Sequence, residues 1–281
     1  MTILQNDLNL SFKPEYLIWS ADISPEKLRL VIDANVLPEG MFIKLDQQFF
    51  LNALAAPLEG SELTLNDIAP IFDLHDLIGA IRSAGLRLFI DWKISEIPTK
   101  TEGIVRALTC LKPDMVNCMA GSLYTTGLQE HSDPQKVDGL TRFAKVCIEN
   151  GIFPCGVTVL TSKDAGIASE EFSRQVSEQV LFYAKLMMKA GFTDLVCSAR
   201  EATVIRQYPE LNGLELNCPG IRLPDTEARD QNRTMTPREA FRSGVNRLVI
   251  GSNLTDGDEP DIVQRVKRNL ERLITHIEGG A

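Results

Sequence analysis

Residues 89–98 read Phe-Ile-Asp-Trp-Lys-Ile-Ser-Glu-Ile-Pro. The apolar run that leads into this segment predicts a buried strand ending at Asp91, because such runs are typical of parallel strands covered on both faces. Residues i and i+2 of an extended chain share a face, so Asp91 and Lys93 can point the same way. Glu96 follows in the turn before the next helix. Charged groups directly after a buried strand indicate a site at the strand ends.

The same alternation of short apolar runs and longer amphipathic stretches extends in both directions from this segment. We expect strands at Tyr16–Asp22, Met41–Leu45, Leu86–Trp92, Asp114–Cys118, Phe153–Thr158, Thr193–Ser198, Leu214–Asn217 and Asn246–Ile250. Helical spacing of apolar residues predicts helices at Ala69–Ala84, Phe172–Ala190 and Pro260–His276.

Strands that alternate with helices in this way predict an α/β fold, a (β/α)8 barrel of eight parallel strands with outer helices. Periodicity alone leaves a doubly wound open sheet as the alternative. Since no linker or repeat is visible, we expect one domain over residues 1–281. The stretch Asp46–Asp67 contains Pro57 and Gly60 and is interpreted as an enlarged loop at the carboxyl end of strand two, the face where barrels bind ligands.

Composition restricts the function classes. The formal net charge is -9 and the pI is about 5.0, which argues against a broad nucleic-acid interface. No apolar run has the length of a membrane span, and the N-terminus lacks the pattern of a secretion signal, so we expect a cytoplasmic protein. The six cysteines form no C-x-x-C pair and are interpreted as reduced, buried thiols; the three histidines lie far apart and suggest no metal site.

Polar residues gather at the carboxyl ends of the predicted strands, where a barrel carries its active site. Oppositely charged groups at one mouth would compensate each other, which makes their burial tolerable. The residues at these ends are Asp22, Lys44, Asp91, Lys93, Asn117, and Thr158 leading into Thr161 and Ser162.

A series of motifs resembles the bacterial orotidine 5'-phosphate decarboxylases, in the family's order and over nearly the whole chain. The family's D-x-K-x-x-D-I-P is matched from Asp91 to Pro98 except at Glu96. Asp22 and Lys44 match its other charged positions. The further matches are Val157-Thr158-Val159-Leu160-Thr161-Ser162, Val196-Cys197-Ser198-Ala199 with Glu201-Ala202, Pro219-Gly220-Ile221-Arg222, and Asp230-Gln231-x-Arg233-x-Met235-Thr236-Pro237.

This resemblance implies a catalytic network of Lys44, Asp91, Lys93 and Glu96, the last supplied by the partner subunit of a homodimer. It implies that Lys93 protonates C6 of the pyrimidine as carbon dioxide leaves, with Asp91 near the substrate carboxylate and no metal or organic cofactor. A fixed ammonium beside a developing carbanion is the electrostatic aid that such a reaction needs. The implied contacts to a nucleotide-like substrate are Asp22 at the ribose hydroxyls, Ser162 at the pyrimidine edge, Gln231 at the phosphate, and Asn117, Thr161, Pro219, Gly251 and Ser252.

The chain departs from the family at the ligand-binding face. Glu96 replaces an aspartate; its extra methylene shifts the carboxylate by on the order of 1 Å, which can cost about a hundredfold in rate. Ser252-Asn253 replaces the arginine and proline of G-R-P-x-T, and losing a charge-assisted grip on phosphate costs roughly 1.5–3 kcal/mol. Lys100 stands at a threonine position that Thr101 would fill after a one-residue slip, and the loop Asn117–Leu123 lacks the family's histidine.

Other cations could replace the missing arginine: Lys100, Arg200 or Arg233. Arg247 begins its strand and should lie at the opposite end of the barrel. Three readings remain open: decarboxylation of orotidine 5'-monophosphate; a diverged decarboxylase or lyase acting on another nucleotide, nucleoside or sugar phosphate; and a non-catalytic barrel. A magnesium-dependent branch would need a carboxylate where Lys44 stands, because Mg²⁺ prefers oxygen ligands.

Overall fold

The strands form a closed barrel. The computed structural model describes residues 10–54, 65–121, 138–161, 163, 165–223 and 235–279. Within them, eight strands pair in parallel in chain order and β8 closes on β1, which confirms the (β/α)8 barrel and rules out the open sheet. The strands are β1 Leu17–Ser20, β2 Phe42–Asp46, β3 Arg87–Ile94, β4 Met115–Met119, β5 Phe153–Val157, β6 Asp194–Val196, β7 Glu215–Cys218 and β8 Arg247–Ile250.

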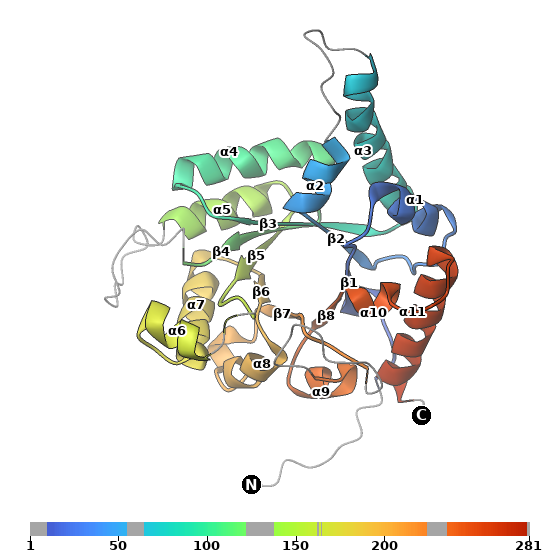
Figure 1. Cartoon of the computed structure of the whole chain (residues 1–281). Helices are drawn as coiled ribbons and strands as arrows, with labels where there is room; N and C mark the ends of the chain where they lie inside the picture. Colours follow the sequence, from blue (N-terminus) through green and yellow to red (C-terminus); the bar gives the residue numbers. More distant parts are fainter. Residues whose placement is uncertain are drawn as a thin grey trace.

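Helices surround the barrel as an outer ring (Figure 1). They are α1 Pro25–Asp33, α2 Gln47–Leu54, α3 Leu65–Ser83, α4 Pro98–Leu108, α5 Asp138–Glu149, α6 Ala165–Phe172, α7 Val176–Ala190, α8 Ala199–Ile205, α9 Pro237–Arg242, α10 Ser252–Thr255 and α11 Ile262–Glu278, with short 3-10 turns at Pro14–Tyr16, Thr109–Leu111 and Pro209–Leu211. The helices expected before β3 and at the C-terminus are confirmed as α3 and α11.

The single helix predicted over Phe172–Ala190 is wrong at its start. Helix α6 ends at Phe172, and Ser173 has a left-handed φ of 53° that breaks the helix. A new helix, α7, begins after Gln175, which forms a capping box with Glu178. Apolar periodicity continues across the break, so it could not reveal it.

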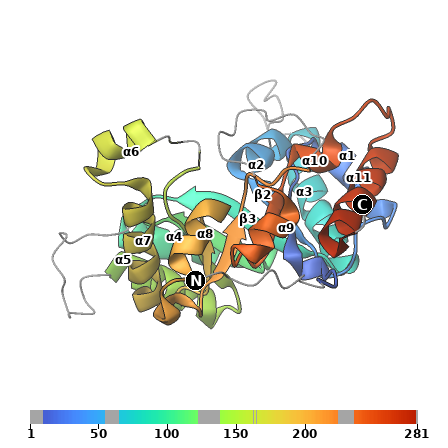
Figure 2. The same ribbon diagram turned by 90° about the horizontal axis from the view of Figure 1, so that it is seen from below.

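The stretch Asp46–Asp67 is not an irregular loop throughout. Helix α2 follows β2 directly, and the Asp46 carboxylate accepts a hydrogen bond from the Phe49 backbone amide in its first turn, 2.8 Å away. Helix α3 begins within the same stretch, at Leu65, and residues 55–64 lie outside the described residues. Helices α2, α6 and α10, which follow β2, β5 and β8, lie toward the same end of the barrel (Figure 2).

Two apolar layers result from the alternation of side chains along the strands. Most buried residues pack between the strands and the helices. A separate cluster fills the barrel interior: Ile18, Phe42, Phe89, Met115 and Cys155, with Val196 and Val249 packed against it. This interior cluster separates the two ends of the barrel, so a site at one end is isolated from groups at the other.

The cysteines, all of which lie in described ranges, are free thiols. Five are buried, as predicted, and burial raises the pKa of the Cys118, Cys147 and Cys155 thiols. The prediction is wrong for Cys110, which is exposed after α4. No helix in the described ranges is both long and apolar enough to cross a lipid bilayer.

Candidate active site

A cavity of about 360 Å³ opens at the carboxyl ends of the strands. Its floor includes Phe89, Val196 and Val249, which belong to or pack against the interior cluster. Nine of the predicted site residues line it: Asp22, Lys44, Asp91, Lys93, Asn117, Thr161, Pro219, Gly251 and Ser252. The chain therefore brings these residues, which span most of its length, to one small volume.

The Asp91 carboxylate is the centre of a network of four polar side chains. Lys44 Nζ lies 2.5 Å from Oδ2, and Lys93 Nζ lies 2.8 Å from Oδ1. Asn117 donates from Nδ2 to Oδ1 over 2.6 Å. Asp91 is 7% exposed and the Lys44 side chain 11%, whereas the Lys93 side chain is 42% exposed and opens to the cavity. One carboxylate thus fixes two ammonium groups that line the cavity, and the Lys93 side chain is the more exposed of the two.

An irregularity in β3 places Lys93. Ile90 pairs with Val116, but Ile94 pairs with Cys118, so β3 contains two more residues than β4 over this interval. Lys93 has a φ of 45°, a left-handed conformation that costs a non-glycine residue about 1–3 kcal/mol and is found preferentially at functional sites. Its backbone amide, displaced from the strand ladder, donates to Asn117 Oδ1 over 2.7 Å. Asn117 therefore holds both the backbone of Lys93 and the carboxylate of Asp91.

The charge of Asp91 is stabilised in this setting. Burial alone would raise the pKa of its carboxyl group, but Lys44 and Lys93 outweigh burial through their charges and hydrogen bonds and lower the pKa to about 2. The carboxylate is therefore ionised at any pH at which the protein is expected to work.

The far side of the cavity carries Asp22 and Arg222. Ser20, at the end of β1, donates its hydroxyl to the Asp22 carboxylate at 3.0 and 3.1 Å. The Arg222 side chain lines the cavity beyond β7. Sequence reasoning placed Arg222 in a motif but missed it as a site residue, and the signal was its place two residues after Gly220, close to the carboxyl end of β7. Lys100 and Arg200, proposed instead, do not line the cavity, and Arg233 lies outside the described residues.

The family follows from a comparison of the sequence with known families. The sequence model of the orotidine 5'-phosphate decarboxylase / HUMPS family matches residues 15–265. This chain belongs to that family. Membership supports a decarboxylase function in general.

Individual relatives agree with this assignment. The chain is 34% identical to the orotidine 5'-phosphate decarboxylase of Pseudomonas fluorescens strain Pf0-1, over 66% of this chain and 75% of that protein. It is 31% identical to the orotidine 5'-phosphate decarboxylase of Dictyoglomus turgidum, over 70% of this chain and 80% of that protein.

Solved structures show the same fold. The orotidine 5'-phosphate decarboxylase from Lactobacillus acidophilus superimposes with a TM-score of 0.63 at 19% identity, over 92% of this chain and 98% of that one. An uncharacterized conserved protein from Geobacillus kaustophilus gives a TM-score of 0.61 at 21% identity, over 92% and 99% of the two chains.

Glu96, predicted as the fourth charged group of the network, does not line the central cavity. It is exposed and borders a second hollow of about 610 Å³ together with Gln47, Trp92 and Ile104. Asp91 and Lys93 border both hollows, so Glu96 lies near the network but not in it. Thr101 is buried in α4, and its hydroxyl donates to the Glu96 carbonyl oxygen over 3.2 Å.

Other predicted residues are placed as follows. Thr158, expected at the mouth, is buried and donates to the Val196 carbonyl oxygen over 2.8 Å, so its role is structural. Ser162 and Gln231 lie outside the described residues. No group of three or more His, Cys, Asp or Glu side chains that could hold a metal ion occurs in the described part of the chain.

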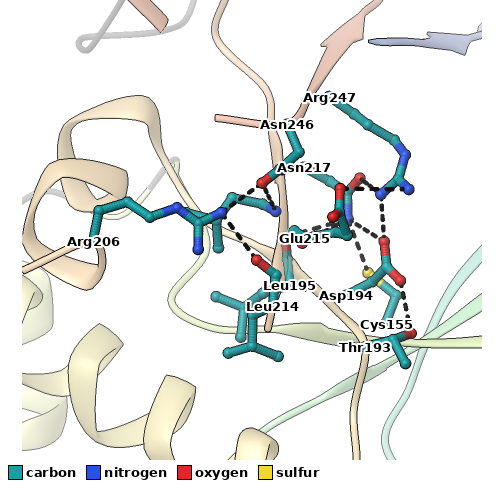
Figure 3. Close-up of polar contacts among 11 residues, drawn as sticks. Cys155, Thr193, Asp194, Leu195, Arg206, Leu214, Glu215, Asn217, Asn246 and Arg247 are labelled. Carbon is teal, nitrogen blue, oxygen red and sulfur yellow. Dashed lines mark hydrogen bonds and ion pairs between the residues drawn. The ribbon is translucent and has the colours of Figure 1, made fainter. Parts of the chain in front are cut away.

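The opposite end of the barrel holds a second polar network (Figure 3). Arg247, at the start of β8, donates from Nη1 to Asp194 Oδ1 over 2.7 Å and to Asn217 Oδ1 over 3.3 Å. Arg206 donates to the Asn246 side chain and to the Leu214 carbonyl oxygen. The prediction that Arg247 lies away from the site is confirmed, and this network joins the amino ends of β6, β7 and β8.

Proposed function

We propose that this protein decarboxylates orotidine 5'-monophosphate to uridine monophosphate. The observation that carries the proposal is the Asp91 carboxylate held between Lys44 and Lys93 at the bottom of a cavity of nucleotide-compatible size. In the proposed step the bond between C6 and the carboxylate breaks, its electron pair stays on C6, and carbon dioxide leaves. Lys93 donates a proton to C6 and regains one from solvent.

The surrounding residues support this assignment. The Lys93 ammonium is fixed by Asp91 and by the strained backbone that Asn117 holds, so little reorganisation is needed as negative charge develops on C6. Asp22 and Arg222 both line the cavity, and in this proposal Asp22 binds the ribose hydroxyls and Arg222 binds the phosphate. Asn117, Thr161, Pro219, Gly251 and Ser252 complete the proposed contacts, with Ser162 at the pyrimidine edge and Gln231 at the phosphate.

We further propose that the protein is a homodimer of single-domain subunits, each spanning residues 1–281. Glu96 is exposed and lies outside the cavity of its own chain. The neighbouring Ile97 is 61% exposed, and Leu51 on α2 is 68% exposed. A second copy that covered these apolar side chains would bring Glu96 toward the partner's network, where it would act as the fourth charged group.

The absorbance change of orotidine 5'-monophosphate tests the proposed reaction. We expect purified protein to consume the substrate and Lys93→Ala to abolish consumption. Lys145→Ala is the matched control, because Lys145 on α5 is 73% exposed and contacts only Glu149 among the described ion pairs. No turnover by folded wild-type protein would contradict the proposal.

One observation favours a second candidate, a decarboxylase or lyase that acts on a different nucleotide, a nucleoside or a sugar phosphate. Ser252, not arginine, stands at the cavity wall next to Gly251. Turnover of a substrate without the 5'-phosphate, with orotidine 5'-monophosphate left intact, would support this candidate over the first.

A further inference from the structure

Asn253 connects two segments at the rim of the cavity. Its Nδ2 donates to the Ile221 carbonyl oxygen over 3.0 Å, and its Oδ1 accepts from Arg222 Nη1 over 3.1 Å. Arg222 Nη1 also donates to the Ile221 carbonyl oxygen over 2.9 Å. Asn253, which comes after β8, therefore forms hydrogen bonds with both the backbone of Ile221 and the guanidinium of Arg222, in the segment that follows β7.

The backbone of Arg222 is fixed independently. Its amide donates to the Met235 carbonyl oxygen over 3.0 Å, and Ile221 forms a parallel bridge with Met235. With the backbone held, the Asn253 contact selects where the guanidinium lies. A bound Nη1 leaves Nε and Nη2 to face a ligand, and no described residue accepts a hydrogen bond from either of them.

The charges around the cavity show what this guanidinium can bind. Asp91 is compensated by Lys44 and Lys93, and the Asp22 carboxylate accepts from Ser20. Among the described residues, no carboxylate pairs with Arg222. A guanidinium that lines a cavity and has no carboxylate partner among the described residues favours an anion.

The position of Arg222 separates this cation from the reacting groups. Lys93 belongs to β3 and Arg222 follows β7, four strands away in a closed eight-stranded barrel. The two cations therefore lie on opposite sides of the mouth. A ligand that spans the cavity would place its reacting end at Lys93 and an anionic end at Arg222.

We propose that Asn253 is a positioning residue that holds Arg222 in place to bind the substrate's phosphate. Recognition of the phosphate charge then does not depend on position 252, where Ser252 replaces the arginine of the G-R-P-x-T motif. This inference rests on the proposed function, since it concerns the phosphate end of that nucleotide. It assigns a role to Asn253 that a proline at this position could not fill, because proline has no side-chain acceptor.

Calorimetric binding of uridine monophosphate and uridine tests the proposal, because the two ligands differ only in the phosphate. We expect wild-type protein to prefer the phosphorylated ligand by about tenfold to a hundredfold. Arg222→Ala should remove most of that preference. Asn253→Ala should reduce it by about threefold to tenfold without changing the affinity for uridine. The double variant should behave like Arg222→Ala alone, because the two residues act through one contact.

Two further variants separate positioning from a general effect on folding. Asn253→Asp keeps the size of the side chain, but its carboxylate would neutralise the guanidinium, so the preference should also fall. Asn212→Ala is the control, because Asn212 is an exposed asparagine before β7 whose described hydrogen bond comes from its backbone, and it should leave the preference unchanged.

A preference that survives in Asn253→Ala and Asn253→Asp would overturn the inference. So would additive losses in the double variant, or equal wild-type affinities for the two ligands. Failure of the proposed function is distinguishable: wild-type protein would leave orotidine 5'-monophosphate intact while the binding preferences followed the expected pattern. That result would contradict the proposed reaction but would still support the role of Asn253 in positioning Arg222.

Discussion

Two buried aspartates stand at opposite ends of the same barrel and have opposite electrostatics. Asp91, at the carboxyl end of β3, is 7% exposed, and two lysines lower the pKa of its carboxyl group to about 2. Asp194, at the amino end of β6, is 1% exposed. Burial raises the pKa of Asp194 by more than Arg247, Thr193 and Asn217 lower it.

The number of cations and the access to a cavity explain this difference. Asp91 has two ammonium partners that both line the cavity, whereas Asp194 has one close guanidinium partner and lies in a closed network. The first network holds positive charge in excess and can offer it to a substrate. The second is close to neutral and fastens three strands together. Burial of a carboxylate therefore does not identify a site by itself; the balance of its partners does.

The largest expected effect concerns Lys93. Replacing Lys93 by alanine should lower kcat/KM for orotidine 5'-monophosphate by at least about a thousandfold, because it removes both the proposed proton donor and a fixed positive charge. The loss of stability should be smaller than for Asp91→Asn, since Lys44 and Asn117 still pair with Asp91 and the Lys93 side chain is 42% exposed. Steady-state kinetics and calorimetry on the same sample measure the activity and the thermal unfolding. An active Lys93→Ala variant would contradict the comparison, because the network around Asp91 would then not be catalytic.

Glu96 sharpens the comparison in another way, because in the proposed dimer the network at the mouth receives its fourth charged group from the partner, whereas the network at the base lies within one chain. A mixture of inactive Lys93→Ala and impaired Glu96→Ala proteins, refolded together, should regain about a quarter of the wild-type activity. Mixed dimers would then carry one intact site with Lys93 from one chain and Glu96 from the other. If Glu96 acts within its own chain, mixing restores no activity.

Conservative substitution of the two aspartates should have unequal effects on stability. Asp91→Asn should lower the free energy of unfolding at pH 7 by about 2–3 kcal/mol, because the folded protein favours the charged form. Asp194→Asn should cost less than about 1 kcal/mol, since asparagine can still accept from Arg247 and Asn217. It should also leave kcat unchanged. Denaturant titrations measure both, and a larger loss at Asp194 would reverse the comparison.

The same pair should show opposite pH dependence, the smallest of the effects. Because the folded pKa of Asp91 is lowered, its stabilisation is present above about pH 4 and is lost as the pH falls toward about 2. The wild type should therefore lose its advantage over Asp91→Asn in that window. The folded pKa of Asp194 is raised, so its contribution is lost as the pH rises through that pKa. Wild type should gain relative to Asp194→Asn as the pH falls from neutral toward about 4. If the stability of wild type relative to each of the two variants changed with pH in the same direction, the result would contradict this account.

The sequence was sufficient to predict the barrel and much of its mouth. Buried parallel strands leave a strong apolar signal, and each strand end then specifies which polar residues converge. This is why Asp22, Lys44, Asp91, Lys93 and Asn117, far apart in the chain, were predicted together and meet at one cavity.

The remaining features of the fold and of the site depend on contacts that a local sequence pattern does not reveal. The bulge in β3 and the left-handed Lys93 follow from pairing with β4, not from the residues of β3 themselves. Arg222 was missed because its side chain reaches the cavity from a loop and is held there by Asn253, which is distant in sequence. Helix α2 lies in a stretch in which Pro57 and Gly60, further along, are typical of a loop, so the local pattern does not predict it.

The reaction run in deuterated water tests the central claim most directly. Proton NMR of the products should show uridine monophosphate without an H6 signal, because C6 carries deuterium, and Lys93→Ala should leave orotidine 5'-monophosphate unchanged. Unaltered substrate with folded wild-type protein, or equal product formation by the Lys93→Ala variant, would contradict the account.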